Sequence, residues 1–111
     1  MDKKLRDQLS KIKLLICDID GVLTDGSFIK STSGDELRSF NALDGVGFVT
    51  LRLLNLNIKT AWITGRESLT TTQRAEELQI DDVYNGVIRK IDAYDELKKK
   101  YGVLDLSLIH I

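Results

Sequence analysis

A short apolar run, Leu14 to Cys17, leads directly into the carboxylates of Asp18 and Asp20. Its apolar side chains are continuous rather than alternating with polar ones, which is typical of a parallel strand covered by helices on both faces. This pattern predicts a buried strand over Lys13–Cys17. Two carboxylates at the end of such a strand repel each other and lose solvation, so they need a cation or a shared proton.

Behind this strand, strand and helix patterns alternate along the chain. A hairpin is expected where Ser27–Ile29 and Leu37–Phe40 flank the turn-forming residues KSTSGDE, and strands are expected at Ile58–Ile63 and Val83–Tyr84. Helices are expected on three apolar stripes (Leu5, Leu9 and Ile12; Val46, Val49, Leu53 and Leu56; Ile91, Tyr94, Leu97 and Tyr101) and over about Ser68–Leu78. Such alternation predicts an α/β fold, with a parallel sheet flanked by helices and a β-hairpin after the first strand.

The length and charge of the chain limit its size and its partners. With 111 residues, the chain is expected to form a single domain over residues 1–111. Its 16 basic and 17 acidic residues give a formal net charge of −1. This balance offers no support for a nucleic acid or an anionic membrane as a partner.

Cys17 is the only cysteine, so an intrachain disulfide is excluded. Its place in the first apolar run predicts a small buried hydrophobe in a reducing compartment. The apolar run behind the basic N-terminus is far shorter than a signal-peptide core or a membrane span. We therefore expect a cytoplasmic protein.

The residues that could carry chemistry follow the predicted strands. Asp18 and Asp20 follow the first strand, Thr64 and Arg66 follow the second, and Lys90 opens the helix after the third. In parallel sheets, ligands bind beyond the carboxyl ends of the strands, so these side chains are expected at one edge. Carboxylate oxygens suit Mg²⁺, which takes one or two carboxylates together with substrate phosphate oxygens. A phosphate ester is the substrate class that this pattern favours.

Three motifs resemble those of a known enzyme superfamily. The string DIDGVLTDG resembles the first motif, DxDGxLTDG, of the haloacid dehalogenase-like (HAD) phosphatases. WITGR carries the second motif's threonine, Thr64, and NGVIRKIDAYDEL carries the third motif's lysine, Lys90. The chain is most similar to the family of 3-deoxy-D-manno-octulosonate 8-phosphate (KDO 8-phosphate) phosphatases, through SFNALDGVGF, the hairpin after LTDG and Arg74 behind ITGR. The resemblance implies a Rossmann-like HAD fold without a cap domain.

The resemblance also implies a role for each motif residue. Asp18 would attack phosphorus and form an aspartyl-phosphate, and Asp20 would act as general acid and then as general base. Both would be ligands of the cofactor Mg²⁺, Asp20 through its backbone carbonyl. Thr64 would donate a hydrogen bond to the transferring phosphoryl group, and Lys90 would neutralise its charge.

Further residues are expected to contact the substrate, a phosphorylated sugar acid of bacterial lipopolysaccharide synthesis. Gly21 would let the backbone turn and present its N–H groups to an anion, and Arg66 would hold the substrate with its planar donors. Gly65 and Arg74 are included through the resemblance. Asp44, Gly45 and Gly47 have two equally open roles: they could contact the substrate, or they could simply start the next helix. The family's members assemble as tetramers, so a homo-oligomer is expected.

One motif of the family is not found in the sequence. An acidic G-D-D loop follows the family's fourth strand, and nothing of this type occurs before Ile111. The last residues, LSLIHI, could be that fourth strand or could be foreign to the protein. We therefore expect a domain that is incomplete at its C-terminus, with weak Mg²⁺ binding and poor activity in the chain as given.

Three other functions remain open at this point. An N-acylneuraminate 9-phosphate phosphatase shares these motifs, and an inactive remnant could serve only as a binding or assembly module. A receiver domain is disfavoured, because its acceptor aspartate would follow the third strand, where this chain has Asn85 and Gly86. Lys98, Lys99 and Lys100 are expected on a solvated helix face, and His110 in the core or at a frayed end.

Overall fold

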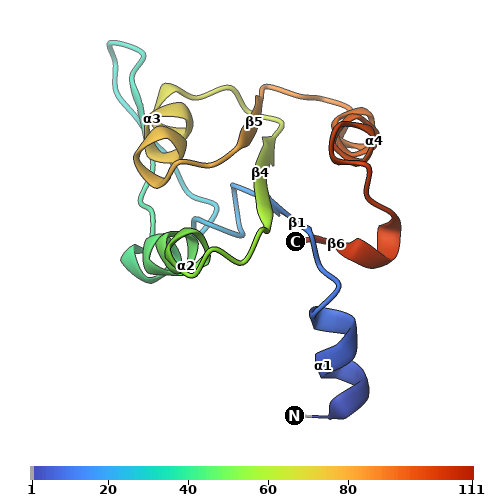
Figure 1. Ribbon diagram of the computed structural model, residues 1–111. Coiled ribbons are helices and arrows are strands. Elements are labelled where there is room, and N and C mark those ends of the chain that lie inside the picture. Colours follow the sequence, from blue (N-terminus) through green and yellow to red (C-terminus); the bar gives the residue numbers. More distant parts are fainter. Residues whose placement is uncertain (1) are drawn as a thin grey trace.

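The computed structural model describes residues 2–111, apart from the side chain of Leu106, and has the predicted alternation of strands and helices (Figure 1). Its elements are α1 (Lys3–Leu9), β1 (Leu14–Asp18), β2 (Ile29–Lys30), β3 (Glu36–Leu37), α2 (Ala42–Leu53), β4 (Lys59–Thr64), α3 (Leu69–Leu78), β5 (Asp82–Asn85), α4 (Lys90–Tyr101), a 3₁₀ turn (Asp105–Ser107) and β6 (Leu108–His110). The α/β fold class predicted from the sequence is confirmed.

Four strands form one parallel sheet in the order β5-β4-β1-β6. The centre of β1 is paired on both sides, with Ile16 opposite Ala61 of β4 and His110 of β6. The tail that could have been a fourth strand does form one within this structure. The strands β2 and β3 form a separate antiparallel hairpin, as predicted, with Ile29 opposite Leu37.

The side chains of the central strands alternate between two cores, one on each face of the sheet. Leu14 and Ile16 pack toward α4, where Leu97 is also fully buried. Cys17 and Trp62 lie in the other core, with side chains from α2 and α3. Figure 1 shows α2 and α3 on one side of the sheet and α4 on the other. Burial on both faces explains why the strand sequences are continuously apolar.

The apolar stripe predicted for α2 is only partly correct: Val49 packs against the core, but Val46, Leu53 and Leu56 are exposed. The buried residues of this helix are Gly45 and Phe48, whereas Val46 is 61% exposed and Leu53 is 75% exposed. The aromatic ring of Phe48 packs edge-on against Trp62, with 5.7 Å between the ring centroids. One large aromatic side chain facing a buried tryptophan sets the rotation of the helix, although the valines and leucines outnumber it.

The stripes predicted for α1 and α4 also need correction. Helix α1 forms but buries none of its residues, and it extends away from the sheet (Figure 1). In α4, Ile91 was predicted on the buried face but is exposed, and Ala93 is buried there instead. A small residue at this position lets the helix approach the sheet closely, which the periodicity of large apolar residues does not reveal.

The lysines at the end of α4 are only partly a solvated face. Lys98 pairs with Asp105, with 2.6 Å between Nζ and Oδ1, and Lys100 pairs with Asp82 of β5. The phenol of Tyr101 also donates a hydrogen bond to Asp82, and burial is the main cause that raises the pKa of Tyr101 to about 12. These contacts fasten the C-terminal end of α4 to the edge of the sheet.

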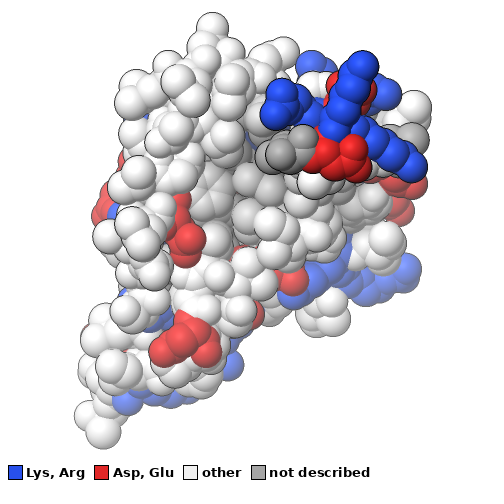
Figure 2. Space-filling model, turned by 90° about the horizontal axis from the view of Figure 1, so that it is seen from below, with Lys and Arg blue, Asp and Glu red and all other residues white. Residues whose placement is uncertain are grey.

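On the face seen from below, charged side chains do not gather in one broad region of a single sign (Figure 2). Seen from below, Lys and Arg side chains form a group with Asp and Glu among them, and much of this face is uncharged (Figure 2). None of the described helices has the length and apolar character needed to cross a membrane.

Candidate active site

The loop after β1 is built around a tight backbone turn. Gly21 and Gly26 have positive φ angles of 86° and 88°, which side chains other than glycine's adopt at a cost. The buried hydroxyl of Thr24 accepts hydrogen bonds from the amides of both glycines, at 3.4 and 3.2 Å. The loop is therefore closed on itself, and it presents Asp18 and Asp20 at the carboxyl edge of the sheet.

Asp18 and Lys90 meet at this edge, although they are far apart in sequence. The Lys90 Nζ lies 3.2 Å from Oδ1 of Asp18, and Lys90 is the first residue of α4. On the other side, Nε2 of His110 lies 3.7 Å from the same oxygen, and the imidazole stacks on Tyr94. His110 is a neighbour of the carboxylate that the sequence did not indicate.

Thr64 ends β4 and holds the loop that follows. Its buried hydroxyl lies 3.3 Å from both the amide nitrogen and the carbonyl oxygen of Arg66. The carbonyl of Thr64 accepts a hydrogen bond from the amide of Val87, which joins the loops after β4 and β5. A side chain at Gly65 would stand 3.4 Å from the carbonyl of Val87, so the loops after β4 and β5 lie close together here.

The carboxylate of Asp20 has a partner from the hairpin. Arg38 follows β3 directly, and its Nε donates to Oδ1 of Asp20 at 2.9 Å. Its Nη1 donates to the hydroxyl of Ser68 at 2.6 Å and lies 3.6 Å from a Glu36 oxygen. Only 1% of the Arg38 side chain is exposed. The sequence offered no signal for this residue, because the contact joins segments that are 18 positions apart.

Arg66 is also engaged by the hairpin. Its guanidinium binds the carboxylate of Glu36 through two hydrogen bonds of 3.1 and 2.7 Å, and it lies over the ring of Phe28 at 3.9 Å. The hydrogen bond between them is the main cause that lowers the pKa of Glu36 and raises the pKa of Arg66. The predicted anion-binding donors of Arg66 thus already face a carboxylate of this chain.

Asn85 at the end of β5 supports the start of α3. Its side-chain oxygen accepts a hydrogen bond from the amide of Ser68, and its side-chain nitrogen donates to the Ser68 carbonyl and to Thr72. Ser68 in turn holds Arg38, so β5, α3 and the hairpin are linked in one polar network. An amide, and not a carboxylate, stands where a receiver domain would carry its phosphate acceptor.

The other predicted substrate contacts, Asp44, Gly45, Gly47 and Arg74, lie on α2 and α3. Asp44 lines a hollow of about 420 Å³ that it shares with Val22–Asp25 and Ser39–Asn41. A side chain at Gly45 would come within 2.6 Å of Nη2 of Arg74, so the structure brings these two predicted residues together. Arg74 also pairs with Glu77, and Gly47 faces an apolar hollow near Cys17. No contact joins Gly45, Gly47 or Arg74 to Asp18 among the interactions of the described residues.

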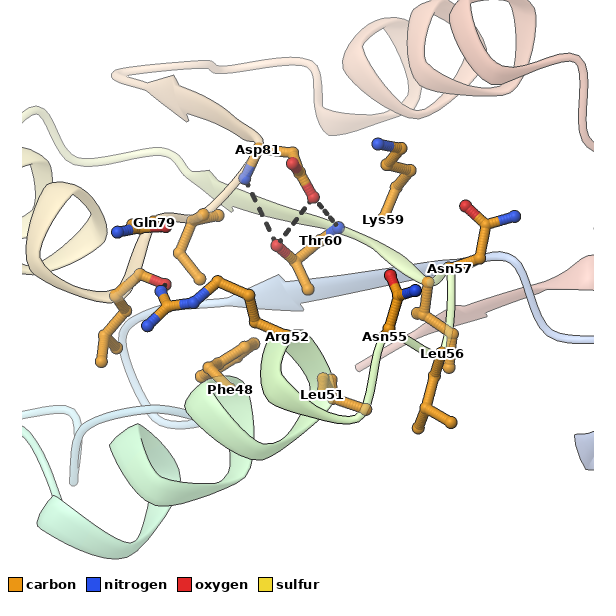
Figure 3. Close-up of a pocket in the computed structure, with 13 residues that line it drawn as sticks. Phe48, Leu51, Arg52, Asn55, Leu56, Asn57, Lys59, Thr60, Gln79 and Asp81 are labelled. Atoms are coloured by element: carbon orange, nitrogen blue, oxygen red, sulfur yellow. Dashed lines mark hydrogen bonds between the residues drawn. The ribbon is translucent and has the colours of Figure 1, made fainter.

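A different hollow lies at the opposite edge of the sheet. Figure 3 shows it between the end of α2 and the beginnings of β4 and β5, with a volume of about 240 Å³. The Asp81 carboxylate in it accepts hydrogen bonds from the backbone and the hydroxyl of Thr60, and Arg52 donates to the carbonyl of Leu78. These groups satisfy one another at the amino ends of the strands, which marks a structural rather than a catalytic feature.

The described residues offer a small set of metal-binding oxygens. They contain no group of three or more His, Cys, Asp or Glu side chains that could hold a metal ion. Oδ1 of Asp18 is buried and accepts no aligned hydrogen bond within the described part of the chain, and its charged neighbour is the Lys90 ammonium at 3.2 Å. The carboxylate of Asp18 is a hard oxygen ligand of the kind that Mg²⁺ takes, and Mg²⁺ needs as few as one or two carboxylates when water and phosphate complete its shell.

Comparison with known proteins agrees with this arrangement, although no family model matches the chain. The chain is 42% identical over 88 residues to the KDO 8-phosphate phosphatase KdsC of Yersinia pestis, an alignment that covers 79% of this chain and 46% of the relative. It is 35% identical over 100 residues to that of Escherichia coli K12, with 90% of this chain and 52% of the relative covered. The chain thus spans about half the length of these curated relatives.

Solved structures give the same result for the fold. The KDO 8-phosphate phosphatase of Moraxella catarrhalis, in complex with magnesium, phosphate and KDO, superposes with a TM-score of 0.88 at 33% identity, covering 99% of this chain and 62% of that chain. A HAD superfamily (subfamily III A) hydrolase from Legionella pneumophila superposes with a TM-score of 0.88 at 38% identity. That alignment covers 96% of this chain and 58% of the hydrolase. By motifs, by sheet topology and by these similarities, the chain has the HAD fold and is similar to the KDO 8-phosphate phosphatases over most of its own length.

Proposed function

We propose that the protein is a Mg²⁺-dependent phosphomonoesterase that hydrolyses KDO 8-phosphate. The observation that carries this proposal is the meeting of Asp18 and Lys90 at the carboxyl edge of the sheet, 3.2 Å apart. A carboxylate beside an ammonium, at the end of a motif that resembles DxDGxLTDG, is suited to attack a phosphorus atom whose charge the ammonium balances. The named relatives and the structure with phosphate and KDO support this substrate.

The proposed reaction has two displacements. In the first, the carboxylate of Asp18 attacks phosphorus, the bond to the sugar oxygen breaks, and Asp20 gives that oxygen a proton. In the second, Asp20 takes a proton from a water molecule that attacks the aspartyl-phosphate, and phosphate leaves Asp18. Lys90 stays beside the phosphoryl group in both steps, and Thr64 donates a hydrogen bond to it.

The other predicted residues serve binding in this proposal. An oxygen of Asp18 and the backbone carbonyl of Asp20 would hold Mg²⁺, which would supply positive charge beside the phosphate. Gly21 and Gly65 leave room for close backbone approach. Arg74 binds the anionic sugar, and Arg66 does so when its guanidinium exchanges Glu36 for the substrate. Asp44, Gly45 and Gly47 line the neighbouring surface. We also propose a homo-oligomer, and the cytoplasmic location expected from the sequence stays a prediction.

The decisive variant is Asp18→Asn in the whole protein. An amide oxygen cannot form the aspartyl-phosphate, so phosphate release from KDO 8-phosphate should fall by at least about 10³-fold, the scale expected for loss of a catalytic nucleophile. The matched control is Asp7→Asn on the exposed helix α1, which should keep its activity. Undiminished hydrolysis by Asp18→Asn would disprove the proposed mechanism.

Two further measurements separate the alternatives. Calorimetric titration with Mg²⁺ should give binding that is weakened in Asp18→Asn, whereas absence of both binding and turnover in the wild type would favour a non-catalytic remnant. Parallel assays should show faster hydrolysis of KDO 8-phosphate than of N-acylneuraminate 9-phosphate. The reverse order would transfer the proposal to the nine-carbon sugar acid.

A further inference from the structure

We infer that Arg38 is a positioning residue that holds the carboxyl group of Asp20 ready for proton transfer. The inference rests on the proposed function, in which Asp20 is the general acid and base. It assigns a catalytic purpose to the hairpin of β2 and β3, whose return strand brings this arginine to the end of β1.

The contact between the two side chains is specific to one atom on each. Nε of Arg38 donates to Oδ1 of Asp20 at 2.9 Å, which leaves Oδ2 for the proton that moves. The Arg38 side chain is 1% exposed, whereas that of Asp20 is 31% exposed and faces the site. A buried guanidinium therefore holds one oxygen of a carboxylate that is itself partly exposed.

The guanidinium is itself held from a second side. Nη1 of Arg38 donates to the hydroxyl of Ser68 at 2.6 Å, and the amide of Ser68 is bound by Asn85 at 2.9 Å. The planar guanidinium thus spans from the start of α3 to the loop after β1. Because its nitrogens have a fixed fork geometry, anchoring Nη1 also orients Nε.

The remaining nitrogen makes the Arg38 guanidinium costly to bury. Its Nη2 is buried and has no hydrogen-bond partner among the described residues. A buried charge is costly unless all its donors are satisfied, and a Leu or Met would fill such a space at lower cost. The presence of a buried guanidinium with one unsatisfied nitrogen is explained if its contact with Asp20 serves the reaction.

Positioning of this kind affects the chemical step in a predictable way. A general acid acts only within hydrogen-bond reach of the oxygen it protonates, and a free aspartate side chain turns about two bonds. This orientation matters for a sugar alkoxide, which must be protonated, and little for nitrophenolate, which leaves without a proton.

The kinetic test compares two esters in the whole protein. Arg38→Met should lower kcat/KM for KDO 8-phosphate by about 10- to 100-fold, a part of the usual contribution of general acid–base catalysis, and for p-nitrophenyl phosphate by less than about 3-fold. Arg38→Lys, which keeps the charge but not the fork, should recover part of the loss. The control Arg6→Met on α1 should leave both values unchanged. An equal fall for both esters, or no fall, would overturn the inference.

A spectroscopic test does not depend on turnover. In nitrogen-15 NMR spectra, the Nε–H of Arg38 should give a slowly exchanging signal apart from those of exposed arginines. That signal should move in Asp20→Asn and stay in place in Asp7→Asn. A signal that exchanges as fast as the others would refute the contact even in an active enzyme. If the wild type cleaves neither ester while the signal behaves as expected, the proposed function fails and the contact stands.

Discussion

Cys17 lies one residue before the proposed nucleophile, yet its surroundings make it chemically inert. Its side chain is packed in the core between the sheet and α2, with 3% of the residue exposed. Burial, followed by the nearby charges of Asp44 and Asp18, raises the pKa of its thiol to about 11. A thiol of this kind is a small apolar side chain and not a second nucleophile.

This raised pKa predicts how stability changes at alkaline pH. Between pH 9 and about 11 the thiol ionises in the unfolded chain but not in the folded one, so the folded state binds more protons there. The free energy of unfolding should therefore fall as pH rises through this range, by at most about 1.4 kcal/mol per pH unit from this group. Its contribution is fully present below pH 9.

Urea unfolding of the wild type and of Cys17→Ala from pH 8 to 11 would measure this effect. The difference in unfolding free energy between the two proteins should shrink steadily above pH 9, because the variant lacks the titrating thiol. Parallel pH curves would show that the thiol ionises equally in both states.

At the scale of elements, the rotation of α2 is set by one aromatic contact. Phe48 is 8% exposed and lies against Trp62, while Val46 on the same helix is 61% exposed. Phe48 is therefore the large buried side chain that α2 contributes to this core, and Val49 packs beside it.

Truncation to alanine should lower the free energy of unfolding by different amounts at Phe48 and at Val46. Phe48→Ala should lower the free energy of unfolding by about 3–5 kcal/mol, because it removes buried apolar surface and leaves a cavity. Val46→Ala should cost less than about 0.5 kcal/mol, the usual range for surface positions. Chemical denaturation of both variants is the measurement. A larger loss for Val46→Ala would show that the outer face of α2 is covered, for example by another subunit.

At the scale of the whole molecule, stability is concentrated in the sheet and its two cores. Strand β1 has a strand partner on each side, and its Leu14 and Ile16 are completely buried. Helix α1 buries none of its residues and extends from the body of the fold (Figure 1). The molecule therefore combines a rigid centre with an element that contributes little packing.

Deletion of residues 1–10 tests whether helix α1 contributes to stability. The melting temperature should fall by less than about 2 °C, because no buried apolar contact is lost. As a comparison, Leu14→Ala should cost about 2–5 kcal/mol and lower the melting temperature far more. Equal effects of the two changes, measured by thermal unfolding, would mean that α1 packs on a surface in solution.

The sequence by itself was sufficient to predict the parallel sheet and the edge that carries the chemistry. Continuous apolar runs define buried strands, and parallel strands place whatever follows them at a common edge. Asp18, Thr64 and Lys90 could therefore be placed there from their order along the chain, and the structure brings Asp18 and Lys90 together. Their catalytic roles remain proposals.

Only the tertiary structure decided which side chains surround that edge and which helix faces are buried. Arg38, Glu36 and His110 reach the site from the hairpin and from β6, through contacts that no local pattern records. The rotation of α2 likewise follows from the space beside Trp62. Periodicity reports how a segment can bury its own apolar residues, whereas a polar contact depends on the distance between segments, which exists only once the chain has folded.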